Sequence, residues 1–229
     1  ELKTKVFQYT LAIAEKVEYM GAGTVEFIYD LDSNAVYFME MNTRLQVEHP
    51  VTEATSGIDI VKAQYDIARG GSIESFKPEE KGYAIEVRVT AEKIVVDSEG
   101  IMQLAPNPGK IVNCVMPERD DIELISIAAS GIEISPFYDS LIAQIICRGK
   151  DRNDVIDKLH AYLDSVVIEG IPTNIALLKR ILKDKTFRDG KYDTSYLPTF
   201  MATLDANELI KEIETAASAE GVAALNTDS

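Results

Sequence analysis

Residues 40–50 read Glu-Met-Asn-Thr-Arg-Leu-Gln-Val-Glu-His-Pro, and their polar side chains fall on every second position. The alternating set consists of Glu40, Asn42, Arg44, Gln46 and Glu48. In an extended backbone successive side chains point to opposite faces, so this spacing places five polar groups on one side. Two interpretations are open: a solvated edge strand, or one wall of a polar functional site.

A β-hairpin is predicted directly before and into this stretch. Residues 24–30 and 36–41 are rich in β-branched and aromatic side chains, and a turn-forming cluster separates them. A turn centred on Ser33 gives these opposite pairs: Asp30 with Val36, Ile28 with Phe38, and Glu26 with Glu40.

The predicted pairing of Glu26 with Glu40 brings two carboxylates together, which destabilises a sheet unless something lies between them. Carboxylate and amide oxygens are the ligands that Mg²⁺ and Mn²⁺ prefer, and Asn42 follows Glu40 on the same face. These residues therefore favour a divalent metal site. An exposed pair separated by water, or a register one residue off, would remove the conflict without a metal.

The composition limits the class of protein. The 229 residues suffice for one large or two small domains of ordinary globular composition. The net charge of −15, from 23 Lys and Arg against 38 Asp and Glu, argues against nucleic acid and anionic membranes as partners. No apolar run approaches the roughly 20 residues of a membrane-spanning helix.

The two cysteines, Cys114 and Cys147, lie in apolar, strand-like runs without CxxC spacing. We therefore expect two reduced thiols rather than a disulfide or a zinc site. Together with the composition, this predicts a cytoplasmic protein, or a mitochondrial matrix protein if the source is eukaryotic.

The chain begins without Met and inside a predicted amphipathic helix, so we expect a segment of a longer polypeptide. We expect that helix to end at Gly21 and to carry one apolar stripe, formed by Val6, Ile13, Val17 and Met20. Two further helices are predicted over residues 51–56 and 58–69.

Residues 72–82 are polar and are the best candidate for a domain boundary. Residues 83–92 alternate as a strand, with Glu86 and Arg88 on its polar face, where such a pair is typical of a surface ion pair. From residue 101 to 148, short apolar runs between Pro and Gly predict an antiparallel sheet or partial barrel.

Within this sheet region, residues 137–140 are either a capped turn or part of the rim of a site. Helices are predicted over residues 151–166, from an N-cap at Thr173 through residue 182, and over residues 207–215. A frayed tail follows.

Residues 39–53, Met-Glu-Met-Asn-Thr-Arg-Leu-Gln-Val-Glu-His-Pro-Val-Thr-Glu, closely resemble the signature of the biotin carboxylases of the ATP-grasp superfamily. Five more segments match in the same order: 21–27, 86–88, 108–111, 138–140 and 169–174. Many ATP-grasp enzymes share a metal-binding Glu and an Asn near Arg. The Gln-Val-Glu-His-Pro extension is what points to biotin carboxylase.

The resemblance implies an α+β fold in two parts. Residues 1–72 would form the C-terminal part of an ATP-grasp domain, a mixed or antiparallel sheet with helices that carries the metal and bicarbonate site. Residues 73–203 would form the sheet-and-helix C-terminal domain of biotin carboxylase, and residues 204–229 a short helix and a disordered tail.

The resemblance also implies an ATP-dependent carbon–nitrogen ligase. It would activate bicarbonate as carboxyphosphate and carboxylate N1 of carrier-bound biotin, within an acyl-CoA or pyruvate carboxylase. The implied cofactors are ATP, Mg²⁺ or Mn²⁺, and biotin. The implied partners are a biotin carboxyl carrier protein or domain, a carboxyltransferase subunit or domain, and a second copy in a homodimer.

Residue roles follow by position. The ligands of the ions that bridge the ATP phosphates would be Glu26, Glu40 and Asn42. Arg44, Gln46 and the backbone at Val47 would bind bicarbonate, with Arg44 also beside the transferred phosphate. Ile171 would contact adenine.

For the reaction itself, the resemblance implies that Glu48 is the general base that deprotonates bicarbonate. Phosphate from the breakdown of carboxyphosphate would take the N1 proton of biotin, and Arg88 would stabilise the biotin enolate. Tyr138 and Asp139 would line the biotin side.

The chain departs from the family in two respects. The family follows the arginine strand with Ala-Glu-Asp/Asn-Pro, whereas residues 91–94 read Ala-Glu-Lys-Ile and a longer segment continues to residue 101. The family's N-terminal domain, glycine-rich lid and ATP-contacting lysines would precede residue 1, so we expect the chain alone to be inactive. The alternatives are a non-catalytic dimerisation or carrier-docking module, and another ATP-grasp ligase such as a carbamoyl-phosphate synthase.

Overall fold

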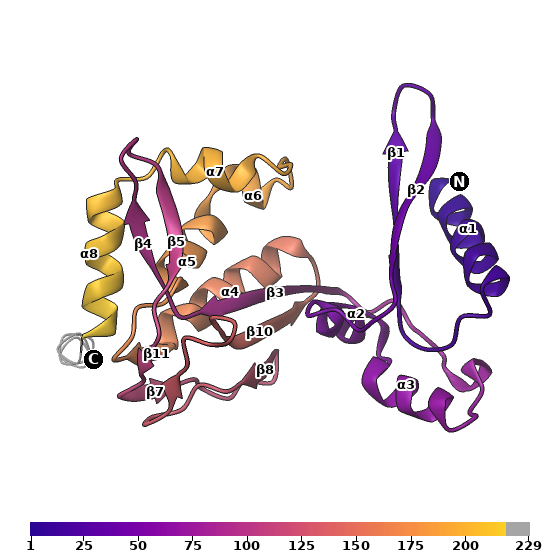
Figure 1. Cartoon of the computed structure of the whole chain (residues 1–229), viewed down its shortest axis with the longest axis horizontal. Coiled ribbons are helices and arrows are strands. Elements are labelled where there is room, and N and C mark those ends of the chain that lie inside the picture. Colours follow the sequence, from indigo (N-terminus) through magenta and orange to yellow (C-terminus); the bar gives the residue numbers. More distant parts are fainter. Residues whose placement is uncertain (219–229) are drawn as a thin grey trace. The chain divides into compact units, whose positions relative to one another are not determined.

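The structure, a computed structural model, describes residues 1–218, and the predicted tail beyond them lies outside the described residues. The chain divides into two compact units, Glu1–Lys81 and Gly82–Ser229 (Figure 1). Both units combine helices with small antiparallel sheets, so the predicted α+β fold class is confirmed. None of the helices within residues 1–218 combines the length and apolar character that crossing a bilayer requires.

The first unit is a β-hairpin accompanied by helices. Its elements are α1 (Leu2–Lys16), β1 (Thr24–Asp30), β2 (Ala35–Asn42), α2 (His49–Ser56), α3 (Ile60–Ala68) and a 3₁₀ turn (Ile73–Ser75). The hairpin and both later helices are present as predicted, but α2 begins two residues earlier and α3 two residues later than expected. The predicted end of the first helix at Gly21 is wrong, because Glu18 adopts a left-handed φ of 51° and the helix has already ended at Lys16. Val17 and Met20 are accordingly exposed.

The hairpin register is confirmed at the carboxylate pair and wrong beyond it. Glu26 lies opposite Glu40, but Asp30 pairs with Ala35 and Ile28 with Tyr37. The turn is one residue shorter than expected, and a β-bulge after Glu26 restores the register. The two glutamates therefore meet although the intervening pairs are displaced.

The second unit is built on a three-stranded antiparallel sheet in the order β3-β10-β8. These strands are β3 (Tyr83–Thr90), β8 (Ile122–Ser126) and β10 (Leu141–Gly149). The two-stranded pairs are β4 (Glu92–Val96) with β5 (Met102–Pro106), β6 (Gly109–Lys110) with β9 (Glu133–Ile134), and β7 (Asn113–Val115) with β11 (Val167–Glu169). The antiparallel strands predicted after residue 101 are present, and the segment that departs from the family, residues 91–101, forms β4 and the turn that leads to β5.

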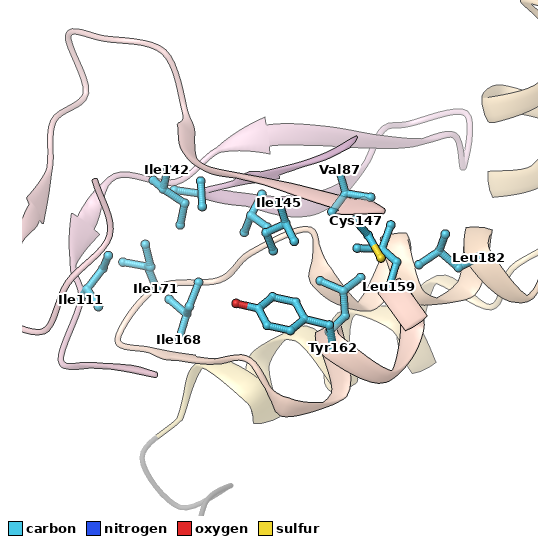
Figure 2. Close-up of a cluster of buried hydrophobic side chains, with 14 of the residues drawn as sticks. Val87, Ile111, Ile142, Ile145, Cys147, Leu159, Tyr162, Ile168, Ile171 and Leu182 are labelled. Carbon is cyan, nitrogen blue, oxygen red and sulfur yellow. The ribbon is translucent and has the colours of Figure 1, made fainter. Parts of the chain in front are cut away.

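The helices of the second unit are α4 (Arg152–Ser165), α5 (Ile175–Lys183), α6 (Lys185–Arg188), α7 (Tyr196–Met201) and α8 (Ala206–Ala217). The main core lies between α4 and the central strand β10 (Figure 2). Ile145 on β10, and Leu159 and Tyr162 on α4, have no exposed surface. A smaller cluster joins Ile94 of the β4–β5 hairpin to Leu209 of α8 and its neighbours.

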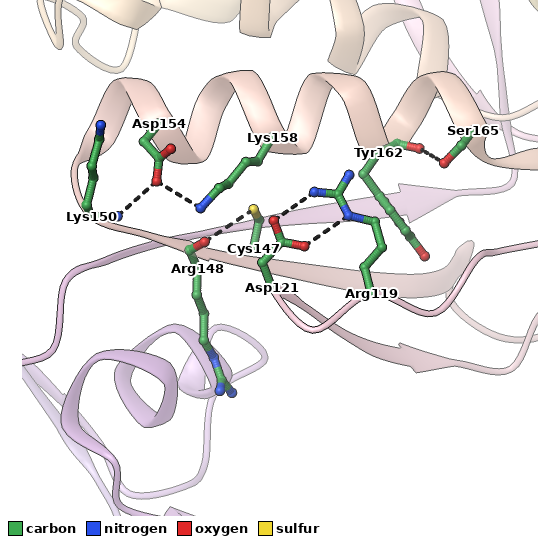
Figure 3. A network of polar contacts seen from close by, with 9 residues as sticks. All are labelled: Arg119, Asp121, Cys147, Arg148, Lys150, Asp154, Lys158, Tyr162 and Ser165. Atoms are coloured by element: carbon green, nitrogen blue, oxygen red, sulfur yellow. Dashed lines mark hydrogen bonds and ion pairs between the residues drawn. The ribbon is translucent and has the colours of Figure 1, made fainter.

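A network of charged groups lies beside Cys147 on β10 (Figure 3). Arg119 donates two hydrogen bonds to Asp121, at 2.9 and 2.7 Å, and on α4 Lys158 bonds Asp154 at 2.9 Å. Both cysteines are free thiols, as predicted, and Cys147 is fully buried. Burial raises the pKa of the Cys147 thiol to about 11, because the thiolate would lose its hydration.

The raised pKa of Cys147 predicts a loss of stability at high pH. The unfolded chain releases the thiol proton near its ordinary pKa of 9.0, whereas the folded chain holds it to about 11. The unfolded state therefore binds fewer protons in this window, and the free energy of unfolding falls as pH rises through it. Denaturant unfolding at pH 8 and 10.5 should show a larger decline for the wild type than for Cys147→Ala. Equal declines would contradict this assignment.

Candidate functional site

A cavity of about 490 Å³ in the first unit is lined by four of the predicted site residues: Glu26, Arg44, Gln46 and Glu48. Glu26 comes from β1, and the other three come from the segment between β2 and α2. Gly23 and Thr52 complete part of the wall. The lining of one space thus includes two acidic residues, an arginine and a glutamine.

The predicted extended strand through residue 48 is wrong, because β2 ends at Asn42. The chain then turns, with the His49 amide donating to the Gln46 carbonyl at 3.2 Å. Pro50 lies in the first turn of α2, where its fixed φ favours the start of a helix. The turn, rather than strand alternation, brings Gln46 and Glu48 to the same cavity.

The carboxylates of Glu26 and Glu40 converge on a single group. The Asn42 amide nitrogen donates to Glu26 Oε1 at 3.0 Å and to Glu40 Oε1 at 3.1 Å. The partly positive NH₂ group therefore lies where a cation would balance both charges. Rotation of the amide by 180° would present its oxygen instead, which completes an oxygen donor set of the kind that Mg²⁺ and Mn²⁺ bind. These three residues fit a divalent ion.

In the second unit, Arg88 lies on β3 opposite Gln144 of β10. Glu86 Oε1 accepts from Arg88 Nε and from Gln144 Nε2, both at 3.3 Å. The prediction of a surface ion pair is wrong for Glu86, whose side chain is 5% exposed while that of Arg88 is 47% exposed. Glu86 Oε2 is also buried and has no hydrogen-bond partner within the described part of the chain.

Sequence reasoning missed Glu86 and Gln144 as neighbours that hold Arg88. Strand alternation identified the polar face of β3. Only the pairing with β10 shows that this face is partly covered, and there Gln144 contacts Glu86 from 58 positions away in the sequence. The available signal was the polar Gln144 within the otherwise apolar run of residues 141–147.

The remaining predicted residues also lie in the second unit. Tyr138 is 84% exposed, and Asp139 Oδ1 accepts from the Leu141 amide at 2.8 Å, so this segment contains a capped turn that leaves the Tyr138 ring exposed. Ile171 is fully buried in the main core, against Gly109. The structure therefore offers no exposed Ile171 side chain for a nucleotide.

Comparison with protein families assigns both units. Residues 1–76 match the ATP-binding domain of the carbamoyl-phosphate synthase L chain, and residues 86–199 match the biotin carboxylase C-terminal domain. The chain belongs to the biotin carboxylase family. Arg88 of β3 and the helices α4 and α5 fall within the biotin carboxylase match.

Individual biotin carboxylases agree with this assignment. Biotin carboxylase 1 of Bacillus subtilis (strain 168) is 41% identical over 203 residues, which are 87% of this chain and 44% of that protein. The 2-oxoglutarate carboxylase small subunit of Hydrogenobacter thermophilus is 42% identical over 186 residues, 80% of this chain and 38% of that protein. The chain therefore spans less than half the length of these relatives.

Solved structures of the family superpose well on the chain. The biotin carboxylase domain dimer of the Hydrogenobacter thermophilus 2-oxoglutarate carboxylase, in complex with MgADP, ADP and bicarbonate, gives a TM-score of 0.75 at 38% identity. That match covers 89% of this chain and 45% of the solved chain. Rhizobium etli pyruvate carboxylase gives a TM-score of 0.77 at 33% identity, covering 87% of this chain and 20% of that one.

Proposed function

We propose that the chain is part of an ATP-dependent biotin carboxylase, a longer polypeptide called here the parent enzyme. The observation that carries this proposal is the convergence of Glu26 and Glu40 on Asn42 beside the cavity lined by Arg44 and Glu48. The proposed parts are an ATP-grasp portion at residues 1–72, a biotin carboxylase C-terminal domain at residues 73–203, and a short terminal segment beyond.

The first half of the reaction is proposed for the first unit. Mg²⁺ or Mn²⁺, held by Glu26, Glu40 and Asn42, would neutralise charge on the phosphates of ATP. Arg44, Gln46 and the Val47 backbone bind bicarbonate, the guanidinium offering a planar fork of donors to the anion. Glu48 removes the bicarbonate proton, and the resulting oxyanion attacks the γ-phosphate to give carboxyphosphate and ADP.

The second half is proposed for the second unit. Carboxyphosphate breaks down to CO₂ and phosphate, and phosphate accepts the proton from N1 of biotin. Arg88 stabilises the negative charge that develops on the biotin ureido oxygen, and N1 then attacks CO₂. Tyr138 and Asp139 line the biotin side. Because Ile171 is buried, we place no nucleotide contact on its side chain.

The carboxyl group would pass on through partners. We propose a biotin carboxyl carrier protein or domain as the holder of biotin and a carboxyltransferase as the next enzyme. A carrier is required because carboxybiotin must leave this site before an acyl-CoA or a 2-oxoacid such as pyruvate can receive the carbon. Support for a homodimer comes from the related domain that was solved as a dimer.

A test of the site is calorimetric titration of Mg·ADP into this chain and into the parent enzyme. We expect Mg·ADP to bind to the parent enzyme and not to this chain, because this chain would supply only part of the nucleotide site. In the parent enzyme, Glu40→Gln should weaken binding by about tenfold or more, since a charged metal ligand is lost. Exposed Glu99 on the turn after β4 gives the matched control, Glu99→Gln. Binding to neither protein would favour the non-catalytic docking module.

A further inference from the structure

Asn174 makes three hydrogen bonds to β3, the strand that carries Arg88. Its side-chain Nδ2 donates to the Arg88 carbonyl at 3.0 Å, and its Oδ1 accepts from the Thr90 amide at 3.0 Å. Its own backbone amide donates to the Thr90 carbonyl at 3.2 Å. Within residues 1–218, β3 is an outer strand that pairs with β10 alone, so these bonds lie on the edge that has no neighbouring strand there. The buried Asn174 takes the place of that neighbour.

The side chain of Asn174 serves β3 instead of its own helix. Asn174 is the N-cap residue of α5, a position where asparagine usually accepts a hydrogen bond from a helix amide, yet it makes no such bond. Four other helices have an N-cap side chain that does bond a helix amide: Asp59, Asp151, Asp184 and Asp205. The usual side-chain hydrogen bond at a helix start is absent here. The carboxamide instead bonds the backbone of Thr90 and Arg88, 84 and 86 positions away in the sequence.

The end of β3 is fixed on its other side by independent contacts. The Ala91 amide donates to the Ser140 carbonyl at 2.8 Å, and the hydroxyls of Thr90 and Ser140 both donate to Glu92. Asn174 supplies the contacts on the opposite edge, directly at the carbonyl of Arg88. Together these bonds define the backbone from which the Arg88 side chain projects.

We propose that Asn174 is a positioning residue for Arg88 in the carboxylation of biotin. This inference rests on the role of Arg88 proposed above. A carboxamide is required because the edge of β3 presents an acceptor and a donor side by side, and one amide offers the matching pair. Loss of either bond lets the strand edge move, which displaces the guanidinium relative to biotin.

The test compares substitutions in the parent enzyme. Asn174→Ser retains a residue that is a good N-cap for α5. The serine side chain is shorter and carries a single hydroxyl, so it cannot bond the Arg88 carbonyl and the Thr90 amide together. Asn174→Asp keeps the acceptor for Thr90 and places a second acceptor against the Arg88 carbonyl. Both should lower biotin-dependent turnover by about tenfold or more, since small misplacements of a reacting group have effects of this size. The control is Asn153→Ser, at an exposed position on α4.

A double-mutant cycle separates positioning from a general structural effect. In an Arg88→Ala background, Asn174→Ser should lower turnover by less than about twofold, because the group it positions is gone. An equal loss in both backgrounds, or a folded Asn174→Ser enzyme with wild-type turnover, would overturn the inference. If Arg88→Ala itself kept the wild-type rate, the proposed function would fail first.

A measurement on the unmodified chain does not depend on any variant folding. Amide hydrogen exchange of Thr90 should be slow, because its amide is bonded to the Asn174 side chain at 3.0 Å. Exchange as fast as that of an exposed turn amide, such as Ser98, would show that the bridge does not persist and would also overturn the inference.

Discussion

Replacing Glu48 by glutamine in the parent enzyme is expected to lower biotin-dependent ATP turnover by about 10²–10⁴-fold, the range that a general base contributes. Glu48 lines the cavity with Arg44 and Gln46, where bicarbonate is proposed to bind. Glutamine keeps the size and the hydrogen-bonding reach of the side chain but cannot accept the bicarbonate proton at neutral pH. The phosphate therefore meets a much weaker nucleophile.

The same substitution should change stability little. Glu48 is exposed and lies outside both hydrophobic clusters, and glutamine has the same size, so the apolar packing of the fold is retained. The melting temperature of Glu48→Gln should match that of the wild type, and Glu99→Gln should leave both rate and stability unchanged. A wild-type rate for Glu48→Gln would remove this residue from the mechanism.

The largest expected effect on stability comes from Leu159→Ala. Leu159 has no exposed surface and packs in the main core of the second unit between α4 and β10 (Figure 2). Truncating a buried leucine removes apolar contacts and leaves a cavity, which costs about 2–5 kcal/mol. The slowest-exchanging amides of β10, such as that of Ile145, should then lose protection by a factor of about 30 to several thousand.

The matched control for this truncation is Leu197→Ala on α7, where the leucine is 38% exposed. Its cost should be well under that of Leu159→Ala, because much of the side chain already contacts water. Similar losses of protection for the two variants would show that the α4–β10 contact is not the centre of the fold.

Local pattern was sufficient for the elements that depend on neighbouring residues. The hairpin strands follow from two β-branched and aromatic runs around a turn, and α4 follows from the apolar stripe that contains Val155, Leu159 and Tyr162. The meeting of Glu26 with Glu40 was predicted from an assumed turn, and it holds because a β-bulge offsets the shorter turn. That agreement depended on two displacements that cancel.

The errors arise where a competing local signal or a distant contact decides. Alternation predicted a strand through residue 48. The strand β2 instead ends at Asn42, and the chain turns before α2 begins at His49, with Pro50 in its first turn. The predicted N-cap at Thr173 is wrong by one residue: Asn174 is the N-cap of α5, and its side chain binds β3. The burial of Glu86 depends on Gln144 across the sheet, and no local pattern reports that pairing.

The central claim is tested most directly by following labelled bicarbonate in the parent enzyme. Supplied with ATP, Mg²⁺, biotin and ¹⁴C-bicarbonate, the enzyme should form labelled carboxybiotin together with ADP, and Arg88→Ala should form far less of the labelled product. ATP hydrolysis that is independent of biotin, with no label on biotin, would contradict a biotin carboxylase and point to another ATP-grasp ligase.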